Sequence, residues 1–366
     1  QGLVLDAMLG IGARHPLDEK LQAAVELVNV AKDNGCTVVS VDIPTGLDAD
    51  SGFAEKVVIA DATITLLALK QGLYLGSGPA VTGKVILEKL LVAEWPPASV
   101  FWSAPEEVEK SLPVRMQDSH KGSFAHITVI GGDYGYGGAA IMAAEAAAKT
   151  GAGMVRLFTR EAHVGAALVR MPSIMSQGVE GTNDLSLLLK QSDVLIVGPG
   201  LGRQPWGEVL FKQAVSSKVP MIIDADGLYW LAQGKYRLPA GCVLTPHIGE
   251  AARLLNSSIE AVKKSPVDAV KVIAKRYNSV CLLKGLSTLV AAPDSAPVIT
   301  GLPESGLAKG GSGDVLTGFV ANCMGVSNGA FEAAILAVAW HNRSAARAAL
   351  QMGRLRVQPL DVLDFL

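Results

Sequence analysis

The sequence predicts an α/β fold built on buried parallel strands. Of the 366 residues, 49% are hydrophobic and only 5% are aromatic, and there are 39 glycines. Short apolar runs alternate with longer amphipathic ones, which is the pattern of parallel strands joined by helices. Glycines gather directly after several of the apolar runs, where tight turns lead from a strand into a helix. The length predicts two or three domains.

Composition also excludes several classes of function. The formal net charge is −2 and no long basic run occurs, which argues against a nucleic-acid or anionic-membrane partner. No uninterrupted apolar stretch reaches about 18 residues, so no membrane span is predicted. The four cysteines lie far apart without a CxxC pair, which predicts reduced thiols in a cytoplasmic protein. They are Cys36, Cys242, Cys281 and Cys323.

A first α/β block extends from residue 2 to about residue 92. Its predicted elements, in order, are a strand at Leu3–Asp6, a helix at Leu17–Asp33, strands at Thr37–Asp42 and Ala62–Ala68, and an edge strand at Lys84–Leu91. The sequence starts inside the first apolar run and without Met, so we expect that upstream sequence is missing from this chain.

A proline-containing segment at 94–99 breaks the periodicity and predicts a linker. The expected organisation is a first domain at 1–100, a bridging segment with one short helix at 101–118, and a second domain at 119–366.

The second domain predicts a largely parallel sheet. Its strands share short runs of buried apolar residues, at His126–Gly131, Met154–Phe158, Val194–Val197, Met221–Ile223, Val243–Thr245 and Val280–Leu283. A hairpin-like pair is predicted from Leu289–Ala292 and Val298–Thr300. Helices are predicted at Gly138–Thr150, Asp314–Met324 and Ala330–Leu350.

A glycine-rich loop leads into the first of the two last helices and carries the most informative motif. The predicted anion loop consists of Gly310, Gly311, Ser312 and Gly313. Free N–H groups and the helix dipole at such a place attract phosphate. The next residue, Asp314, would act as a base beside a phosphoryl group. The alternative is that it only caps the helix.

Polar or glycine-rich clusters also follow five strands of the second domain. They lie at Gly132–Ala139, Gly198–Gly202, Asp224–Asp226, Thr245–Glu250 and Lys284–Thr288. Because the carboxyl ends of parallel strands meet at one sheet edge, we expect these clusters to converge with the anion loop. Asp226 is expected to cap a helix near Gly227, whereas Asp224 is the better functional candidate. For His247, a structural role and a ligand contact are equally compatible with the pattern.

These motifs, with His120-Lys121-Gly122 ahead of the first strand, resemble the ADP-dependent NAD(P)H-hydrate dehydratase family of the ribokinase-like fold. The resemblance covers residues 119–366 and implies a three-layer α/β/α domain that uses ADP as phosphoryl donor, with Mg²⁺. It implies that Asp314 is catalytic, as the base that deprotonates the hydroxyl of the hydrated nicotinamide. The implied hydrate contacts are Ala139, Gly202, His247 and Asp314. The implied nucleotide contacts are Lys284, Gly285, Leu286, Ser287, Thr288 and Gly313. The chain departs from the family at Phe124-Ala125, where a glycine is usual, and at Tyr229, where Asn is common.

In the first block, carboxylates and glycines follow the first two strands, at Asp6–Gly12 and Val41–Asp48. Helix caps and turns account for this pattern as well as a site for a dinucleotide and a hard cation does. The block resembles the C-terminal half of an NAD(P)H-hydrate epimerase domain, a partial Rossmann-like three-layer unit. The implied K⁺ ligands are Asp6 and Thr45. The implied hydrate contacts are Gly10, Ile11, Gly12, Ala13, Arg14, His15, Pro16 and Asp42. The family's upstream Asn-rich motif does not occur in this sequence, so we expect a truncated domain with an incomplete epimerase site.

The function predicted from the sequence is repair of hydrated NADH and NADPH, called NADHX and NADPHX. The dehydratase would convert the S form to NAD(P)H with release of AMP and phosphate, paired with an epimerase that interconverts the R and S forms. The alternative for the second domain is an ATP-dependent kinase of a small-molecule alcohol. The alternative for the first is a non-catalytic nucleotide-binding scaffold. We also expect a homo-oligomer.

Overall fold

The computed structural model describes residues 2–12, 16–90, 98–103, 112, 116–180, 183–234, 236–301, 303–327 and 329–366. The chain divides into two compact units. The first comprises Gln1–Phe101, Glu260–Val267 and Gly285–Ser287, and the second comprises Trp102–Ile259, Asp268–Lys284 and Thr288–Leu366. Each unit is described by itself.

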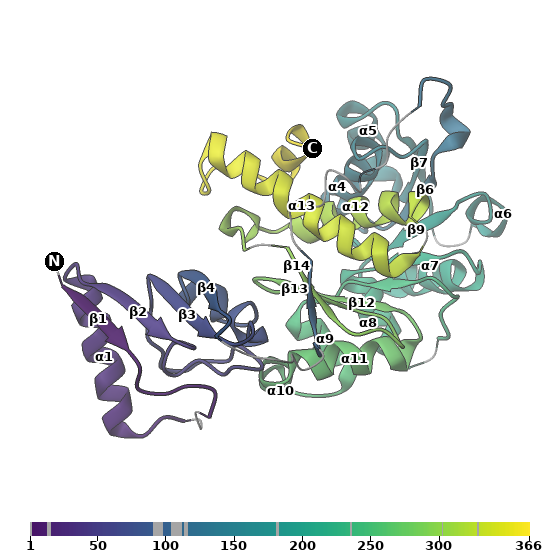
Figure 1. Cartoon of the computed structure of the whole chain (residues 1–366). Coiled ribbons are helices and arrows are strands. Elements are labelled where there is room, and N and C mark those ends of the chain that lie inside the picture. The colour runs from purple at the N-terminus through teal and green to yellow at the C-terminus, as the bar shows by residue number, and fades with distance from the viewer. Residues whose placement is uncertain are drawn as a thin grey trace. The chain divides into compact units, whose positions relative to one another are not determined.

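The first unit contains a four-stranded parallel sheet with the order β1-β2-β3-β4 (Figure 1). Its strands are β1 (Leu3–Asp6), β2 (Thr37–Val41), β3 (Ala62–Leu66) and β4 (Lys84–Glu88). Helix α1 (Glu19–Asp33) packs against β1 and β2, after Asp18 caps it by accepting a hydrogen bond from the Leu21 N–H. The short turns η1 (Gln71–Leu73) and α2 (Gly78–Val81) and the short helix α10 (Ile259–Lys264) complete the regular elements of this unit.

The second unit contains a ten-stranded sheet with the order β5-β14-β13-β12-β11-β10-β9-β6-β7-β8. Its strands are β5 (Phe101–Trp102), β6 (His126–Ile130), β7 (Met154–Thr159), β8 (Met175–Gly178), β9 (Val194–Val197), β10 (Met221–Ile223), β11 (Val243–Leu244), β12 (Val280–Leu283), β13 (Thr288–Ala291) and β14 (Val298–Thr300). From β12 to β8 neighbouring strands are parallel, whereas β13 and β14 are antiparallel, as the hairpin-like pair predicted.

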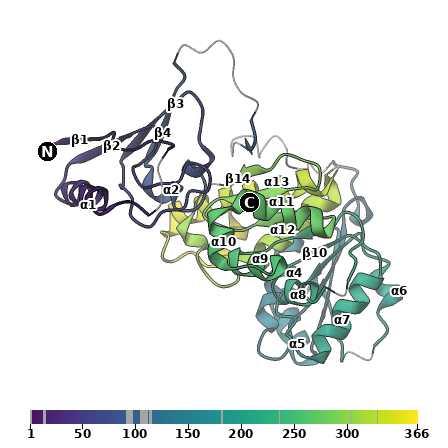
Figure 2. The same cartoon turned by 90° about the horizontal axis from the view of Figure 1, so that it is seen from below.

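Helices cover both faces of this sheet. Their bounds are η3 (Lys121–Ser123), α4 (Gly137–Lys149), α5 (Glu161–Arg170), α6 (Ser186–Leu189), α7 (Pro205–Ser216), α8 (Ala225–Leu231), α9 (Ile248–Leu255), α11 (Pro266–Tyr277), η4 (Ser305–Leu307), α12 (Ser312–Val326), α13 (Ala330–Met352) and η5 (Pro359–Asp364). Helices α4, α12 and α13 lie on one face, and α7, α9 and α11 lie on the other (Figures 1 and 2). The predicted three-layer α/β/α architecture is therefore confirmed.

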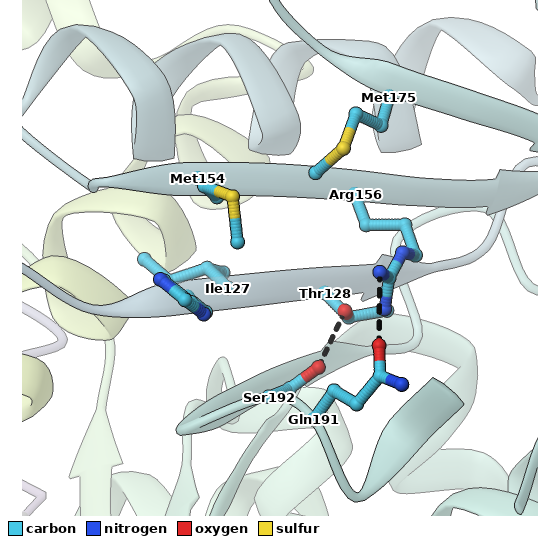
Figure 3. A pocket seen from close by; sticks show the side chains of 8 residues that line it. Ile127, Thr128, Met154, Arg156, Met175, Gln191 and Ser192 are labelled. Carbon is cyan, nitrogen blue, oxygen red and sulfur yellow. Dashed lines mark hydrogen bonds between the residues drawn. The ribbon is translucent and has the colours of Figure 1, made fainter. Parts of the chain in front are cut away.

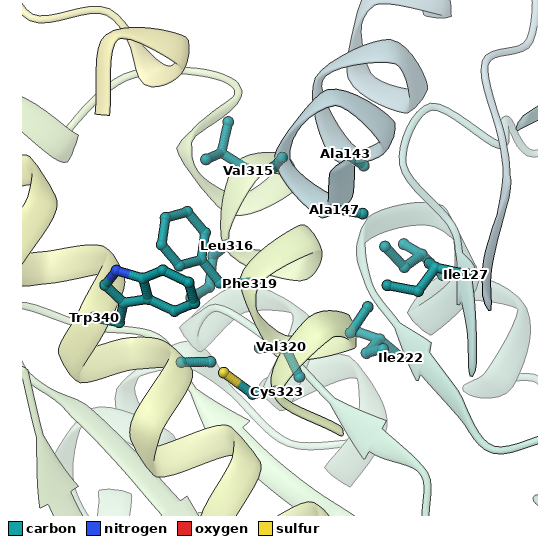
Figure 4. Packing of buried hydrophobic residues seen from close by; sticks show 14 of the residues in the cluster. Ile127, Ala143, Ala147, Ile222, Val315, Leu316, Phe319, Val320, Cys323 and Trp340 are labelled. Atoms are coloured by element: carbon teal, nitrogen blue, oxygen red, sulfur yellow. The ribbon is translucent and has the colours of Figure 1, made fainter. Parts of the chain in front are cut away.

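Helix α12 is the centre of the main hydrophobic core (Figure 4). Phe319 meets Trp340 of α13 edge to face, with ring centroids 5.1 Å apart. On its other side α12 lies so close to α4 that a Cβ at Gly318 would stand 2.5 Å from the Cβ of Ala146. Only glycine allows this approach, so Gly318 lets the middle of α12 pack closely against α4.

Two strands of the large sheet were not predicted. Strand β8 is Met-Ser-Gln-Gly, which has neither an apolar run nor a clear alternation. Strand β5 has two residues and lies in the segment that we expected to be a bridge with a short helix. That helix falls largely on residues outside the described ranges. Within those ranges, no helix is both long and apolar enough to cross a membrane.

Candidate functional site

Polar residues directly follow three neighbouring parallel strands and lie at one edge of the large sheet. Asp224 follows β10, Thr245 follows β11 and Lys284 follows β12. The Asp224 carboxylate is 2% exposed, and its Oδ1 accepts from the Thr245 hydroxyl at 2.7 Å and from Lys284 Nζ at 2.7 Å. A buried carboxylate needs such partners because water cannot solvate it. Through these two contacts, the Asp224 carboxylate connects the carboxyl ends of three neighbouring strands.

The amino end of α12 faces this ion pair. The helix begins at Ser312, two residues earlier than predicted, after Gly311 adopts the left-handed region at φ 99°. Asp314 therefore lies in the first turn and makes no cap, so the capping alternative for Asp314 is wrong. A Cβ at Gly313 would stand 3.2 Å from Lys284 Nζ, which shows how closely the helix start approaches the lysine.

The electrostatics of this group raise the pKa of two side chains. Burial, reinforced by the negative charge of Asp224, raises the pKa of Asp314 from 3.8 to about 7, although Lys284 opposes the shift. Burial disfavours the charge of Lys284, but the carboxylates of Asp224 and Glu250 outweigh it, so the pKa of Lys284 is raised. The site therefore holds a permanent cation beside a carboxyl group that can take or release a proton near neutral pH.

His247 and Glu250 begin helix α9 with a reciprocal cap. The Glu250 carboxylate accepts from the His247 N–H at 2.9 Å, and His247 Nδ1 accepts from the N–H groups of Gly249 and Glu250 at 2.9 and 3.3 Å. Burial and Lys284 lower the pKa of His247, so the ring is neutral near pH 7 and carries its proton on Nε2. Burial raises the pKa of Glu250. His247 thus has a structural role in the cap, and its Nε2 lies 3.5 Å from Glu250 Oε1 while the side chain stays 60% exposed.

Two glycine-rich loops pack on each other at the same sheet edge. A Cβ at Gly202 would lie 2.5 Å from Asp133 Oδ2, and one at Gly200 would lie 2.4 Å from the Tyr136 carbonyl oxygen. Ala139 lies in the first turn of α4, just after the first of these loops. The structure thus brings the loops that carry Ala139 and Gly202 together, as the sequence predicted.

The expected cap by Asp226 is wrong. Helix α8 starts at Ala225, and Asp226 lies within its first turn. The Asp226 carboxylate instead accepts from the Gly202 N–H at 3.1 Å and from Arg203 Nε at 2.9 Å. It therefore fastens the loop that carries Gly202 to α8.

The segment predicted to contact the nucleotide after Lys284 joins β12 to β13. The Leu286 side chain is half exposed, whereas Ser287 and Thr288 are buried. Thr288 is already the first residue of β13. For Gly285 to Thr288, the nucleotide contact stays a prediction.

In the first unit, Asp6 and Thr45 lie in direct contact. The Asp6 carboxylate is 1% exposed and accepts from the Thr45 hydroxyl at 2.6 Å, the Thr45 N–H at 2.9 Å and the Ser40 hydroxyl at 2.8 Å. These donors are all neutral, and no basic side chain among the described residues contacts Asp6. Nowhere in the described part of the chain do three acidic, His or Cys side chains form a ready metal site.

Asp42 is held in an unusual conformation. Its φ of 69° lies in the left-handed region, which costs energy for a residue with a side chain. Its carboxylate pairs with Lys70 and accepts from the Leu66 N–H at 3.1 Å. A Cβ at Gly10 would lie 3.7 Å from Asp42 Oδ2, so these two predicted contacts are adjacent.

Of the remaining predicted contacts in the first unit, Ile11 and Gly12 are exposed, as is Pro16. Ala13, Arg14 and His15 lie outside the described residues. Lys70 was missed at the sequence level. The available signal was its position, four residues after the end of β3, at the same sheet edge as Asp42.

A pocket of about 240 Å³ lies elsewhere, lined in part by the first residues of β6, β7 and β8 (Figure 3). Those residues are His126, Met154 and Met175. Because Asp224, Thr245 and Lys284 follow the carboxyl ends of strands in the same parallel sheet, this pocket is at the opposite edge. It contains no residue of the site.

Comparisons with known proteins agree with this geometry. The sequence profile of the NAD(P)H-hydrate dehydratase family matches residues 127–366, and that of the YjeF-related protein N-terminus matches residues 1–72. A bifunctional NAD(P)H-hydrate repair enzyme of Coxiella burnetii is 35% identical over 100% of this chain and 75% of its own length. The corresponding Escherichia coli enzyme is 35% identical over 100% of this chain and 70% of its own length.

Solved structures show the same fold for the second unit. A ribokinase-like superfamily protein from Enterococcus faecalis has a TM-score of 0.67 and 28% identity, covering 75% of this chain and 96% of its own. The ADP/ATP-dependent NAD(P)H-hydrate dehydratase of Bacillus subtilis, co-crystallised with ATP and Mg²⁺, has a TM-score of 0.65 and 25% identity. That match covers 73% of this chain and 96% of the Bacillus chain. The dehydratase profile matches about two thirds of the chain, and the two repair enzymes match all of it. The chain therefore belongs to the family of bifunctional NAD(P)H-hydrate repair enzymes.

Proposed function

We propose that the second unit dehydrates the S hydrates of NADH and NADPH with ADP as phosphoryl donor, releasing AMP and phosphate. The observation that carries this proposal is the position of Asp314, a carboxyl with a pKa of about 7 beside Lys284 at the start of α12. Hydroxide is a poor leaving group and phosphate is a good one, so a phosphate-binding helix start can serve an elimination. We also propose that residues 119–366 form the dehydratase domain and residues 1–100 belong to the epimerase domain.

In the first step, Asp314 takes the proton of the hydroxyl on the hydrated ring. The hydroxyl oxygen forms a bond to the β-phosphorus of ADP while the bond from that phosphorus to AMP breaks. The N–H groups of Gly311 to Gly313 and the Lys284 ammonium stabilise the charge of the transferring group. In the second step, the C–O bond breaks and phosphate leaves with the bonding electrons. A proton leaves the neighbouring ring carbon to the departing phosphate or water, and its C–H electrons form the double bond that restores the dihydronicotinamide ring.

His247 suits the hydrate because its Nε2–H is a neutral donor. The side chain is 60% exposed, and its other ring nitrogen is already used as the helix cap. A neutral donor can bind the carboxamide or ribose of the substrate without attracting the competing negative charge of the phosphates. The loops that carry Ala139 and Gly202 pack together at the same sheet edge, where they would contact the same ligand.

Mg²⁺ fits the acidic surroundings of Lys284. Glu250 and Asp224 both act electrostatically on that lysine, and Mg²⁺ is usually held by one or two carboxylates together with substrate phosphates and water. When bound, the ion would neutralise charge on the phosphates of ADP.

In the first unit, K⁺ fits Asp6 and Thr45. Asp6 is a buried carboxylate with only neutral donors around it, and a monovalent cation would supply the missing opposite charge. Asp42, with Lys70 beside it and Gly10 close by, would contact the hydrate during epimerisation. The cation would hold the Asp6 strand end and the Thr45 turn together.

A product assay tests the proposal for the second unit. The purified chain is incubated with S hydrate, Mg²⁺ and either ADP or ATP, and absorbance at the NADH band, free phosphate and phosphate esters are followed. Formation of NADH with equal release of phosphate supports the dehydratase. A stable phosphate ester without NADH would instead identify an alcohol kinase.

The pH dependence follows from Asp314. The carboxylate must be deprotonated to act as a base, and its pKa is about 7. We therefore expect kcat/KM of dehydration to fall as pH decreases through about 7 and to reach a plateau above it. A profile measured with saturating ADP checks this, and a flat profile from pH 6 to 8 (chosen as about one unit on either side of the pKa) contradicts it.

Gly313→Ala tests the proximity of the helix start to Lys284. The new Cβ would lie 3.2 Å from Lys284 Nζ and 3.7 Å from Asp224 Oδ2, so the ammonium must shift by a few tenths of an ångström. We expect KM for ADP to rise roughly tenfold, which corresponds to about 1.4 kcal/mol. Gly165→Ala in α5 is the matched control, because no atom lies within 4 Å of its Cβ position. An unchanged KM for ADP would place the nucleotide elsewhere.

A further inference from the structure

One basic and aromatic cluster near the site has no role in the scheme above. The ring of Tyr229 on α8 is close to two guanidinium groups, with Arg203 Cζ 4.6 Å and Arg253 Cζ 5.8 Å from its centroid. Arg203 directly follows Gly202, and Arg253 lies on α9, the helix that His247 caps. We call these three residues the Arg203–Tyr229–Arg253 cluster.

The cluster is held firmly against the loop of Gly202. The indole of Trp230, the residue after Tyr229, donates to the Gly202 carbonyl oxygen at 2.9 Å. Asp226, on the same helix, accepts from the Gly202 N–H and from Arg203. These bonds fix the distance between Tyr229 and a loop that the family resemblance assigns to the hydrate.

The cluster carries an uncompensated positive charge. Arg203 pairs with Asp226, whereas the exposed Arg253 has no hydrogen bond or ion pair with any residue that the structure describes. Arg253 still acts on the site, because its charge contributes to the lowered pKa of His247 and opposes the rise in the pKa of Glu250 that burial causes. A guanidinium that stacks on an aromatic ring keeps the N–H groups at its edge free, and these can bind two phosphate oxygens in a bidentate way.

We propose that the Arg203–Tyr229–Arg253 cluster binds a phosphate group of the dinucleotide hydrate, with Arg253 as the principal contact. The phosphate is either the 2′-phosphate of NADPHX or a bridging phosphate present in both hydrates. The proposal rests on the dehydratase function of the second unit.

The test is the KM of Arg253→Ala for NADHX and for NADPHX at saturating ADP. We expect an increase on the order of tenfold, as for the loss of one exposed charge-assisted contact. An increase for NADPHX alone assigns the 2′-phosphate, and an equal increase for both hydrates assigns a bridging phosphate. Because the nucleotide binds elsewhere, KM for ADP should stay unchanged. Unchanged KM values for both hydrates overturn the proposal.

Two further variants control this experiment. Arg253→Lys keeps the charge but loses the bidentate geometry of the guanidinium, so we expect its KM for the hydrates to lie between those of wild type and Arg253→Ala. A KM as high as that of Arg253→Ala also supports bidentate binding of the phosphate. Lys190→Ala removes one exposed charge after α6, at the opposite sheet edge, and should leave both KM values unchanged. A matching rise in that variant would mean that net charge alone acts, and would overturn the proposal.

Failure of the proposed function can be distinguished from failure of this inference. If the wild-type chain does not dehydrate either hydrate, the function is wrong. The cluster is then tested by titrating NADH and NADPH into the whole chain and following tryptophan fluorescence, since Trp230 adjoins the cluster. Equal dissociation constants for wild type and Arg253→Ala contradict the inference.

Discussion

Asp314→Asn should abolish dehydration while leaving the fold intact. The amide keeps the size and the position in the first turn of α12 but cannot accept the substrate proton. We expect a loss in kcat of at least ~10²-fold, the low end for removal of a general base. Nucleotide binding should persist, because Lys284 and the N–H groups of the anion loop are unchanged. The measurement is the rate of NADH formation at saturating ADP and hydrate.

The same variant should be more stable than wild type above neutral pH. In the folded state the pKa of Asp314 is about 7, against 3.8 ordinarily, so the folded chain holds a proton that the unfolded chain releases. Wild-type stability therefore falls as pH rises from about 3.8 to about 7, and Asp314→Asn lacks this contribution. Asp268→Asn is the matched control, since Asp268 is the third residue of α11 and is exposed. Activity of Asp314→Asn within a few-fold of wild type would contradict the assigned role.

Lys284→Met should remove both the ADP response and a large part of the stability. Asp224 is almost fully buried, and Lys284 is its basic partner. Breaking such a pair leaves an uncompensated charge and costs about 3 kcal/mol. Activity should drop by about 10²-fold or more through the loss of a charge that stabilises the transferring phosphoryl group. Because Lys284 also opposes the pKa shift of Asp314, any residual activity should need a higher pH.

A double variant separates the two effects of Lys284. In Lys284→Met/Asp224→Asn the buried carboxylate is gone, so much of the free energy of unfolding should return while activity stays low. Chemical denaturation of both variants, beside an ADP titration of the rate, provides the comparison. A Lys284→Met chain that keeps its stability and its ADP dependence would show that this lysine is not the nucleotide contact.

The sequence predicted most of the fold because the strands have clear apolar runs. It also predicted the sheet edge of the site, since polar residues after parallel strands must gather there. It could not predict β8, whose Met-Ser-Gln-Gly sequence is stabilised by pairing with β7 rather than by its own pattern. The sequence also could not predict which side chains pair with each other, because Asp224 and Lys284 are 60 positions apart in the chain.

Cap assignments were the least predictable part of the site. Both Asp226 and Asp314 have the residue type of a cap, but both lie within the first turn of their helices. Gly311 provides the actual helix boundary through its left-handed backbone, and Asp226 is drawn instead to Arg203. Tertiary contacts, and not the local preference of Asp for cap positions, therefore determine where these two carboxylates bind.

The ion pair of Asp224 and Lys284 also bears on how the second unit folds. Its two residues, with Thr245 between them in the chain, come together only after β10, β11 and β12 have aligned in register. Until then the lysine and the carboxylate remain hydrated and separate, so catalytic competence arises at the end of assembly. On the proposed function, ADP would bind only the aligned state and would thereby shift the equilibrium toward it. The nucleotide would in this sense be a folding ligand of the unit, and its concentration would affect how long the enzyme stays folded as well as how fast it works.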